Sequence, residues 1–111
     1  MNEKELLAQV ALGEDSSRQF KVNFTSPDKL AAEMAAFANS EGGTIYIGVA
    51  NDGSTPGLGS DEVERLNQMI ANVASQNIKS PITVSTENIK VSNGNLLIVV
   101  RVPRVKANPI S

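Results

Sequence analysis

Six basic side chains are the residues of this sequence best suited to contact a ligand, and the ligand that suits them is phosphate. They are Arg18, Lys21, Lys90, Arg101, Arg104 and Lys106. Lys and Arg bind the phosphates of nucleic acids with an affinity that depends on salt and carries no base preference. For each cation alone, a solubilising charge on an edge strand is the simpler interpretation. No aromatic residue is interleaved with the cations of the C-terminal part, so the sequence gives little support for stacking on bases.

The charge of the chain is unevenly distributed. Residues 1–78 hold five Lys or Arg and eleven Asp or Glu, a net charge of −6, whereas residues 79–111 hold five Lys or Arg and one Glu, a net charge of +4. Such asymmetry is typical of a basic surface on an acidic body, although ordinary scatter is the alternative. We therefore predict that nucleic-acid affinity runs chiefly through the C-terminal cations Lys90, Arg101, Arg104 and Lys106, with a smaller contribution from Arg18 and Lys21.

The composition excludes several kinds of site. The 111 residues include no cysteine and no histidine, which removes disulfides, thiolate chemistry, the commonest metal ligand and the commonest general base. No apolar run approaches the ~18 residues of a membrane span, and no signal peptide opens the chain. We expect a cytoplasmic protein with no membrane partner and no metal site.

The glycines do not form a nucleotide-binding motif. Neither Gly-x-x-x-x-Gly-Lys-Ser/Thr nor Gly-x-Gly-x-x-Gly occurs in the sequence. The glycines instead flank a strand and fill a loop, and turn geometry explains them. We therefore expect no cofactor.

Hydrophobic periodicity predicts three helices and four strands. In chain order they are a helix over 2–12, a strand over 19–24, a helix over 26–40, a strand over 44–49, a helix that starts at 60, and strands over 82–91 and 96–103. Asn2 and Ser26 are expected to cap the first two helices, and Asp61 and Glu64 to form a capping box at the third. Positive φ at Gly42 or Gly43 is expected to end the second helix.

Alternation assigns side chains to the two faces of the strands. The residues expected to share one apolar face are Phe20, Val22 and Phe24 in the first strand and Ile45, Ile47 and Val49 in the second. Gly48 inside the second strand indicates a bulge or another backbone that passes close by.

The last two strands are expected to form a hairpin. Asn93-Gly94 is the preferred centre of a two-residue type I′ turn, which would pair Ile89 with Ile98. That register puts Lys90 and Arg101 together on the more exposed face.

The resulting fold class is α/β (α+β), with a four-stranded mixed sheet, two main helices and a short N-terminal helix in a βαβαββ arrangement. We expect one domain over 1–111, with its N-terminal helix within 1–13. The tail over 104–111 has little to hold it and is compatible with further domains beyond it.

One stretch carries a family resemblance. Residues 36–49 read Ala-Phe-Ala-Asn-Ser-Glu-Gly-Gly-Thr-Ile-Tyr-Ile-Gly-Val, with Asp-Gly at 52–53, and they resemble the signature of the Schlafen AlbA_2 domain. The resemblance extends over roughly 14–103 and includes weaker matches at Gly57-Leu58 and Pro81. The matching positions are Glu14, Phe20, Lys21, Phe37, Asn39, Gly42, Gly43, Gly48, Asp52 and Gly53.

The resemblance implies an Alba-like fold and a function in nucleic-acid binding. Such modules are described as candidate DNA-binding domains, often at the N-terminus of predicted bacterial transcriptional regulators. Some relatives are labelled ATP-binding, and some Schlafen proteins cut RNA with three metal-holding carboxylates. Those carboxylates map here to Glu14, to Gln19, and to Ala50 or Asn51 with Asp52 adjacent. Since an amide is a poor ligand for a hard cation, the resemblance does not imply an enzyme here.

We therefore predict a non-catalytic nucleic-acid-binding module that favours DNA over RNA. One alternative is a Schlafen-like nuclease or ATP-binding domain with a degenerate acidic site. The other is a dimerisation module that pairs through the exposed hairpin or the tail.

Overall fold

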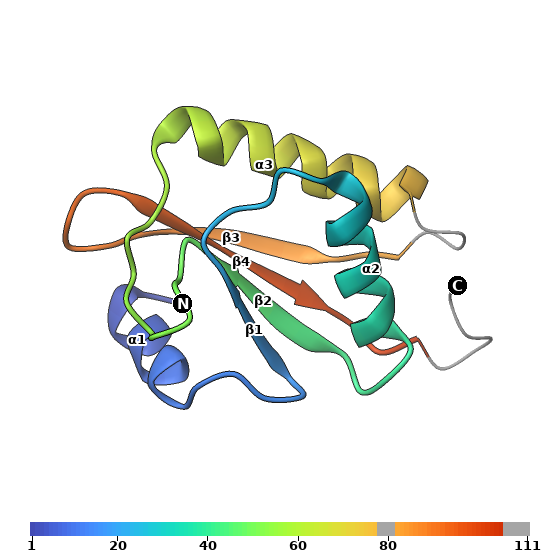
Figure 1. The fold of residues 1–111 in the computed structure, drawn as a ribbon, viewed down its shortest axis with the longest axis horizontal. Coiled ribbons are helices and arrows are strands. Elements are labelled where there is room, and N and C mark those ends of the chain that lie inside the picture. Colours follow the sequence, from blue (N-terminus) through green and yellow to red (C-terminus); the bar gives the residue numbers. More distant parts are fainter. Residues whose placement is uncertain (78–81, 106–111) are drawn as a thin grey trace.

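Four strands form one mixed sheet in this protein (Figure 1). The structure is a computed structural model, and it describes residues 1–77 and 82–105. Their order across the sheet is β1-β2-β4-β3. The strands are β1 (Arg18–Lys21), β2 (Gly43–Ile47), β3 (Ser85–Lys90) and β4 (Leu96–Val102). β1 and β2 are parallel, and β4 runs antiparallel to both of its neighbours. The mixed α/β (α+β) class predicted from the sequence is confirmed.

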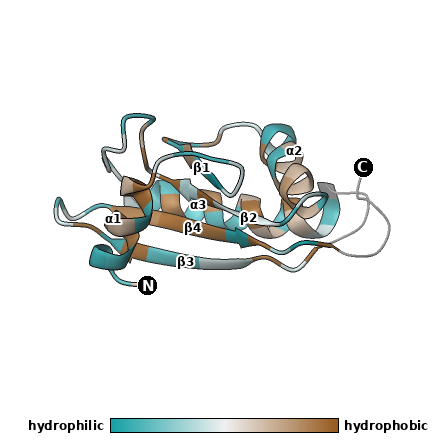
Figure 2. Cartoon of the chain, turned by 90° about the horizontal axis from the view of Figure 1, so that it is seen from below, coloured by the Kyte–Doolittle hydropathy of each residue, from teal (hydrophilic) through white to brown (hydrophobic). Residues whose placement is uncertain are grey.

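Three α-helices cover the sheet from its two faces. They are α1 (Glu3–Ala11), α2 (Pro27–Ala38) and α3 (Ser60–Asn72), the last continued by a π-helical turn, η1 (Val73–Asn77). The central strand β4 is apolar along most of its length, whereas the edge strand β3 is mainly polar (Figure 2). This difference follows from position, because β4 is buried on both faces and β3 is buried on little of either.

The alternation of side chains along the strands produces two separate apolar cores. On one face, α2 and α3 bury a cluster that includes Leu30, Met34, Phe37, Ile45, Ile47, Leu66, Ile70, Ile98 and Val100. On the other face, two residues of α1 pack against the sheet and its adjoining loops. This second cluster consists of Leu6, Val10, Phe20, Tyr46, Val49, Ile89, Val91, Leu97 and Val99. This second core includes Ile89, Leu97 and Val99, so the hairpin contributes side chains to both cores.

Two of the three predicted helix caps are present. Asn2 accepts from the amide of Glu5, whose side chain accepts from the amide of Asn2, and Ser26 caps α2 with Pro27 as the first helical residue. The capping box predicted at Asp61 is wrong. Gly59 is the N-cap of α3 and no side chain caps that helix, because the helix already begins at Ser60.

The strand predicted over 19–24 ends early, at Lys21. Val22 is therefore 54% exposed, and Phe20 and Phe24 are buried in opposite cores instead of sharing one face. The reason is that the chain leaves the sheet after the carbonyl of Lys21, which accepts hydrogen bonds from both Gly48 N (2.7 Å) and Val49 N (3.2 Å).

Two successive amides on one carbonyl make a bulge in β2, and Gly48 has the positive φ, +101°, that allows it. The bulge turns the side chain of Val49 into the α1 core with Tyr46. The prediction that Val49 shares a face with Ile45 and Ile47 is therefore wrong. Gly48 also lies against Gly57, since a Cβ at Gly48 would be 3.2 Å from the Gly57 Cα. The close approach predicted from the sequence is confirmed.

The hairpin is shifted by one residue from the predicted register. Ile89 pairs with Leu97 instead of Ile98. Gly94 N donates to Val91 O (2.9 Å) and Gly94 has φ +90°, whereas no residue other than glycine has positive φ within 1–77 and 82–105. A type I′ turn would need positive φ at Asn93 as well, so the loop is a type I turn followed by a left-handed Gly94. The side chains of Asn93 and Asn95 hold this loop by donating to Pro56 O.

The C-terminal segment after β4 is better held than its sequence indicates. Val105 N donates to Ala38 O (2.9 Å), and the Val105 side chain packs against the α2 core. Pro81 and residues 106–111, which include Lys106, lie outside the described residues.

The turn from α2 to β2 depends on Gly42, as predicted. Gly42 has φ +80° and its amide donates to Phe37 O (2.8 Å). A Cβ at Gly42 would lie 2.8 Å from Val102 O and 2.9 Å from Arg104 N. The turn is therefore packed directly against the end of β4.

We expect Gly42→Ala to destabilise the protein more than Gly94→Ala. Both glycines have positive φ, and a residue with a β-carbon destabilises such a site by about 1–2 kcal/mol. A Cβ at Gly94 meets nothing within 4 Å, whereas one at Gly42 also overlaps backbone atoms, at a further cost of about 1–3 kcal/mol. Urea unfolding of the two variants measures the difference. Equal losses of stability would contradict the packed turn.

Candidate nucleic-acid interface

Two arginines lie on either side of a threonine in one row across the sheet. Thr44 on β2 pairs with Arg18 on β1 and with Arg101 on β4. Residues paired across neighbouring strands point to the same face. Phe20 and Tyr46 form the next pair on the same face, two residues along, and they belong to the α1 core. The row therefore lies on the α1 face of the sheet. All three residues of the row are only half-buried.

Arg18 is held by its own loop. Its Nη2 lies 2.6 Å from Asp15 Oδ2, its Nε donates to Gly13 O (3.2 Å), and Nη1 lies 3.5 Å from Gln9 Oε1. The pKa of Asp15 is lowered mainly by the hydroxyl and amide of Ser17, and also by the charge of Arg18. Arg18 is therefore kept at the edge of the row, with its side chain 18% exposed.

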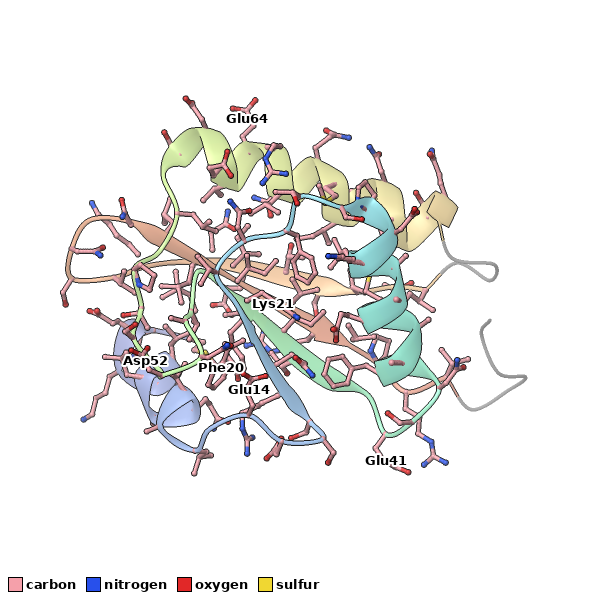
Figure 3. All side chains as sticks on the ribbon, in the orientation of Figure 1. Glu14, Phe20, Lys21, Glu41, Asp52 and Glu64 are labelled. Carbon is pink, nitrogen blue, oxygen red and sulfur yellow. The ribbon has the colours of Figure 1, made fainter. Side chains whose placement is uncertain are left out.

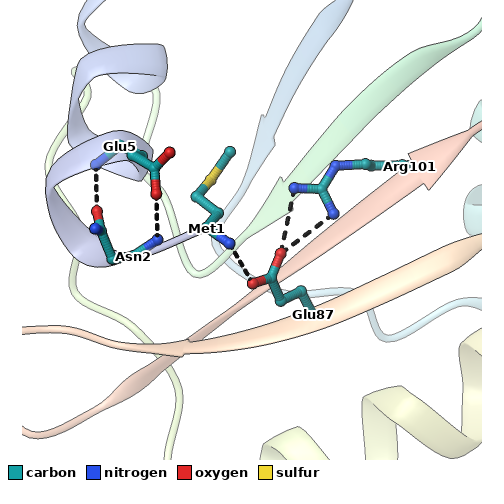
Figure 4. Close-up of polar contacts among 5 residues, drawn as sticks. All are labelled: Met1, Asn2, Glu5, Glu87 and Arg101. Atoms are coloured by element: carbon teal, nitrogen blue, oxygen red, sulfur yellow. Dashed lines mark hydrogen bonds and ion pairs between the residues drawn. The ribbon is translucent and has the colours of Figure 1, made fainter.

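Arg101 is held by Glu87 on the neighbouring strand. Both terminal nitrogens of Arg101 lie 3.2 Å from Glu87 Oε1, and the α-amino group of Met1 lies 2.6 Å from Glu87 Oε2 (Figure 4). The pKa of Glu87 is lowered, first by the hydrogen bond from the Met1 amino group and then by Arg101. The guanidinium remains 41% exposed.

Tyr46 lies two residues along β2 from Thr44, on the same face of the sheet. The residue is only 3% exposed, and its ring packs edge-on against Phe20 with centroids 5.9 Å apart. Burial raises the pKa of the Tyr46 phenol, while the charges of Arg18 and Arg101 act in the opposite direction. The Tyr46 ring is therefore held in place by the α1 core.

Arg104 lies at the same end of the sheet as this row. It follows the last pair of the β2–β4 ladder, Gly43 with Val102, and its Nη1 is 3.2 Å from Glu41 Oε2. Both side chains are largely exposed, at 51% and 82%. Such a pair contributes little to stability, which leaves Arg104 available to another anion.

Lys90 does not join these arginines, and the prediction that it shares a face with Arg101 is wrong. Lys90 pairs with Leu96, at the opposite end of β4 and on the opposite face. The five-residue separation from Leu96 to Arg101 corresponds to about 17 Å along the strand. The shifted hairpin register is the cause. Within the described residues, no ion pair includes the exposed Lys90.

Lys21 faces the other side of the sheet from Arg18, as the alternation predicts. Its Nζ is 3.6 Å from Glu33 Oε1 and 5.9 Å from the centroid of the Phe24 ring. Lys21 thus belongs to the surface beside α2 and not to the row.

The positions that correspond to the acids of Schlafen nucleases do not share one hollow. Figure 3 labels Glu14 and Asp52, which both lie near α1. Gln19 lines a hollow of about 190 Å³ with Glu33 and Ser40 on the α2 side. Asn51 and Asp52 line another, of about 290 Å³, which reaches Gly13 just before the exposed Glu14.

The acid side chains around these hollows have structural partners. Asp52 accepts from the amide and the hydroxyl of Ser54, which lower its pKa. No three His, Cys, Asp or Glu side chains gather into a metal-binding group in 1–77 and 82–105.

Thr44 and Tyr46 are site residues that the sequence does not reveal. No motif distinguishes a threonine and a tyrosine in an apolar strand. Only the pairing of β2 with β1 and β4 places Thr44 between Arg18 and Arg101. The cations themselves could be listed from the sequence, but not their grouping or their carboxylate partners.

Comparison with known proteins confirms the family resemblance. The family model described as Schlafen, AlbA_2 matches residues 14–111. None of the curated proteins compared with the chain matches it. Helices long and apolar enough to cross a membrane are absent from the described part of the chain.

A solved structure shares the fold. It is the solution structure of the N-terminal domain of a RecG-related protein from Nitrosomonas europaea, named as a candidate ATP-dependent DNA helicase. The similarity has a TM-score of 0.72 at 19% identity and covers 100% of this chain and 80% of that one. At this identity, the similarity concerns the fold.

We expect the pKa of Glu87 to rise toward its ordinary value of 4.5 in Arg101→Ala, because one of the cations that lower it is removed. In the parent, the depressed pKa means that the ionised carboxylate stabilises the fold above pH ~4.5, and that this contribution is lost as pH falls through the folded-state pKa. NMR titration of the Glu87 carboxyl carbon measures the shift. Lys90→Ala, on the other face, is the matched control; an unchanged Glu87 pKa in Arg101→Ala would contradict the ion pair.

Proposed function

Because this chain belongs to the Schlafen AlbA_2 family, we propose that it is a non-catalytic nucleic-acid-binding module that contacts phosphates through Arg18, Arg101 and Arg104. DNA is the preferred ligand in this proposal, in keeping with the helicase name of the structurally similar domain. The module would serve a bacterial transcriptional regulator in the cytoplasm.

The observation that carries the proposal is the grouping of these arginines at one end of the sheet. Neighbouring strands lie about 4.8 Å apart, so the Cα atoms of Arg18 and Arg101 are separated by about 10 Å. Both arginines flank Thr44 on one face, and Arg104 follows from the end of β4 beside Glu41. Arginine suits this task because its planar group binds phosphate oxygens in pairs.

The carboxylates beside the three arginines set the expected strength of binding. Asp15, Glu87 and Glu41 each pair with one arginine. Exposed pairs of this kind are worth only about 0–1 kcal/mol, so a phosphate can compete for the guanidinium. The carboxylates nevertheless reduce the local positive charge. We therefore expect modest affinity that falls steeply with salt.

The non-catalytic part of the proposal is supported by Gln19. It stands where the second acid of the Schlafen nucleases would be, and an amide carries no charge for a hard cation. Gln19 and Asp52 also line different hollows. The carboxylates near these two positions therefore do not face one common site.

We expect Arg101→Ala combined with Arg104→Ala to make the negative slope of log K against log salt for duplex DNA less steep by about two. The double variant should also weaken binding to all DNA sequences alike. Neither side chain is in a core, so folding should be retained. Fluorescence anisotropy at several salt concentrations measures the slope.

The matched control for this double variant is Lys29→Ala combined with Lys90→Ala. It also removes two exposed positive charges but leaves the arginine end of the sheet intact. Loss of binding in the control alone would instead assign the interface to the hairpin end. If neither the parent nor the control binds DNA or RNA at low salt, the family fold here serves self-association, and light scattering should give a mass above that of a monomer.

We expect no cleavage of structured RNA or of DNA by this protein with Mg²⁺ or Mn²⁺, because Gln19 cannot replace a metal-binding carboxylate. A gel assay with labelled substrates measures cleavage. Metal-dependent cleavage that is abolished by Glu14→Ala would overturn the non-catalytic assignment and favour the nuclease alternative.

A further inference from the structure

We propose that Arg18, Thr44, Tyr46 and Arg101 form a binding site for a single phosphate group on the α1 face of the sheet. This inference deepens the proposed function and rests on it for the source of the phosphate, a nucleic-acid strand. The site itself can be tested with inorganic phosphate.

The side chains of this site differ in length. Thr44 is short and stands between two long arginines in the same cross-strand row. In the next row, Phe20 pairs with Tyr46, and their edge-on ring contact fixes the tyrosine in place. The floor of the site is therefore rigid sheet, and its two walls are guanidinium groups.

Two hydroxyl groups at this floor have no hydrogen-bond partner among the described residues. These are the hydroxyls of Thr44 and Tyr46. Tyr46 is 97% buried as a residue, yet no buried side-chain polar atom in the described chain lacks a partner, so its hydroxyl must reach solvent. A phenylalanine would serve the apolar core equally well, whereas the tyrosine places a donor beside two cations.

The two arginines keep donors in reserve for a ligand. A guanidinium has five N–H donors. Arg101 uses one donor of each terminal nitrogen for Glu87, and Arg18 uses one donor of each of its three nitrogens for Gly13, Gln9 and Asp15. Asp15 and Glu87 sit on the outer sides of the row and orient the planar groups. A phosphate above Thr44 would accept from both arginines and both hydroxyls, and it would compete with Asp15 and Glu87 for the two guanidinium groups.

Phosphate fits this set of donors better than a carboxylate does. Its oxygens are tetrahedrally arranged and can accept from walls and floor together, while a planar carboxylate suits a single guanidinium. The group could be a phosphodiester of the backbone or a terminal phosphomonoester, and both present the same oxygens.

Titration with inorganic phosphate at constant ionic strength, followed by amide NMR, tests the site directly. We expect saturable shifts at Thr44, Tyr46 and Arg101 that chloride does not produce. Thr44→Val and Tyr46→Phe remove only the hydroxyl groups and should each weaken phosphate binding, by roughly tenfold for a hydrogen bond to a charged group. Lys29→Ala, which removes an exposed cation elsewhere on the surface, should have no effect.

Glu87→Gln provides a variant that should improve the site. It removes the carboxylate that competes for Arg101 and should tighten phosphate binding severalfold. Shifts that map elsewhere, or phosphate affinity that is unchanged in both Thr44→Val and Tyr46→Phe while these variants remain folded, would overturn the proposal.

Oligonucleotides with and without a 5′-phosphate identify the source of the group. Tighter binding of the phosphorylated strand, reduced by Tyr46→Phe, supports a terminal phosphate; equal binding of both strands, equally reduced, supports a backbone phosphate. If inorganic phosphate binds at Thr44 but no oligonucleotide does, the site stands and the nucleic-acid function fails. If oligonucleotides bind as tightly to both hydroxyl variants as to the parent, the function stands and the site fails.

Discussion

The hydrogen-bonded register of β4 is the constraint on which the structure depends. β4 lies between β2 and β3 and is buried on both faces, so a shift of one residue would exchange the two cores. The same register places Arg101 opposite Thr44, which in turn pairs with Arg18. One set of backbone hydrogen bonds therefore fixes both the packing of the protein and the geometry of its arginine row.

Most of the elements could be predicted from the sequence, because their signals are local. The caps at Asn2 and Ser26, the left-handed Gly42 and the close approach at Gly48 each follow from residue type and spacing. The wrong predictions concern segments whose conformation is determined by contacts with residues far away in the sequence. The hairpin loop is tied to Pro56 O by Asn93 and Asn95, which favours a three-residue loop over the type I′ turn that Asn-Gly alone favours.

The same distinction applies to the candidate site. The basic residues could be listed from composition, and alternation separates Arg18 from Lys21 correctly. Their grouping could not be predicted, because one residue of slip in the hairpin moves Lys90 to the other face. The carboxylate partners also come from other segments, as Glu41 does for Arg104. An acidic chain with a net charge of −2 can thus present a few oriented cations without a broad basic surface.

The position of β4 also has a consequence for folding during synthesis. β4 lies inside the sheet but follows the other three strands along the sequence, so β2 has only β1 beside it until the residues up to Val102 have left the ribosome. Contacts between such distant segments close slowly, and until then the apolar residues of both cores lack the strand that they pack against. The nascent chain therefore exposes apolar surface until β4 has been synthesised, and such surface is of the kind that chaperones shield on emerging polypeptides.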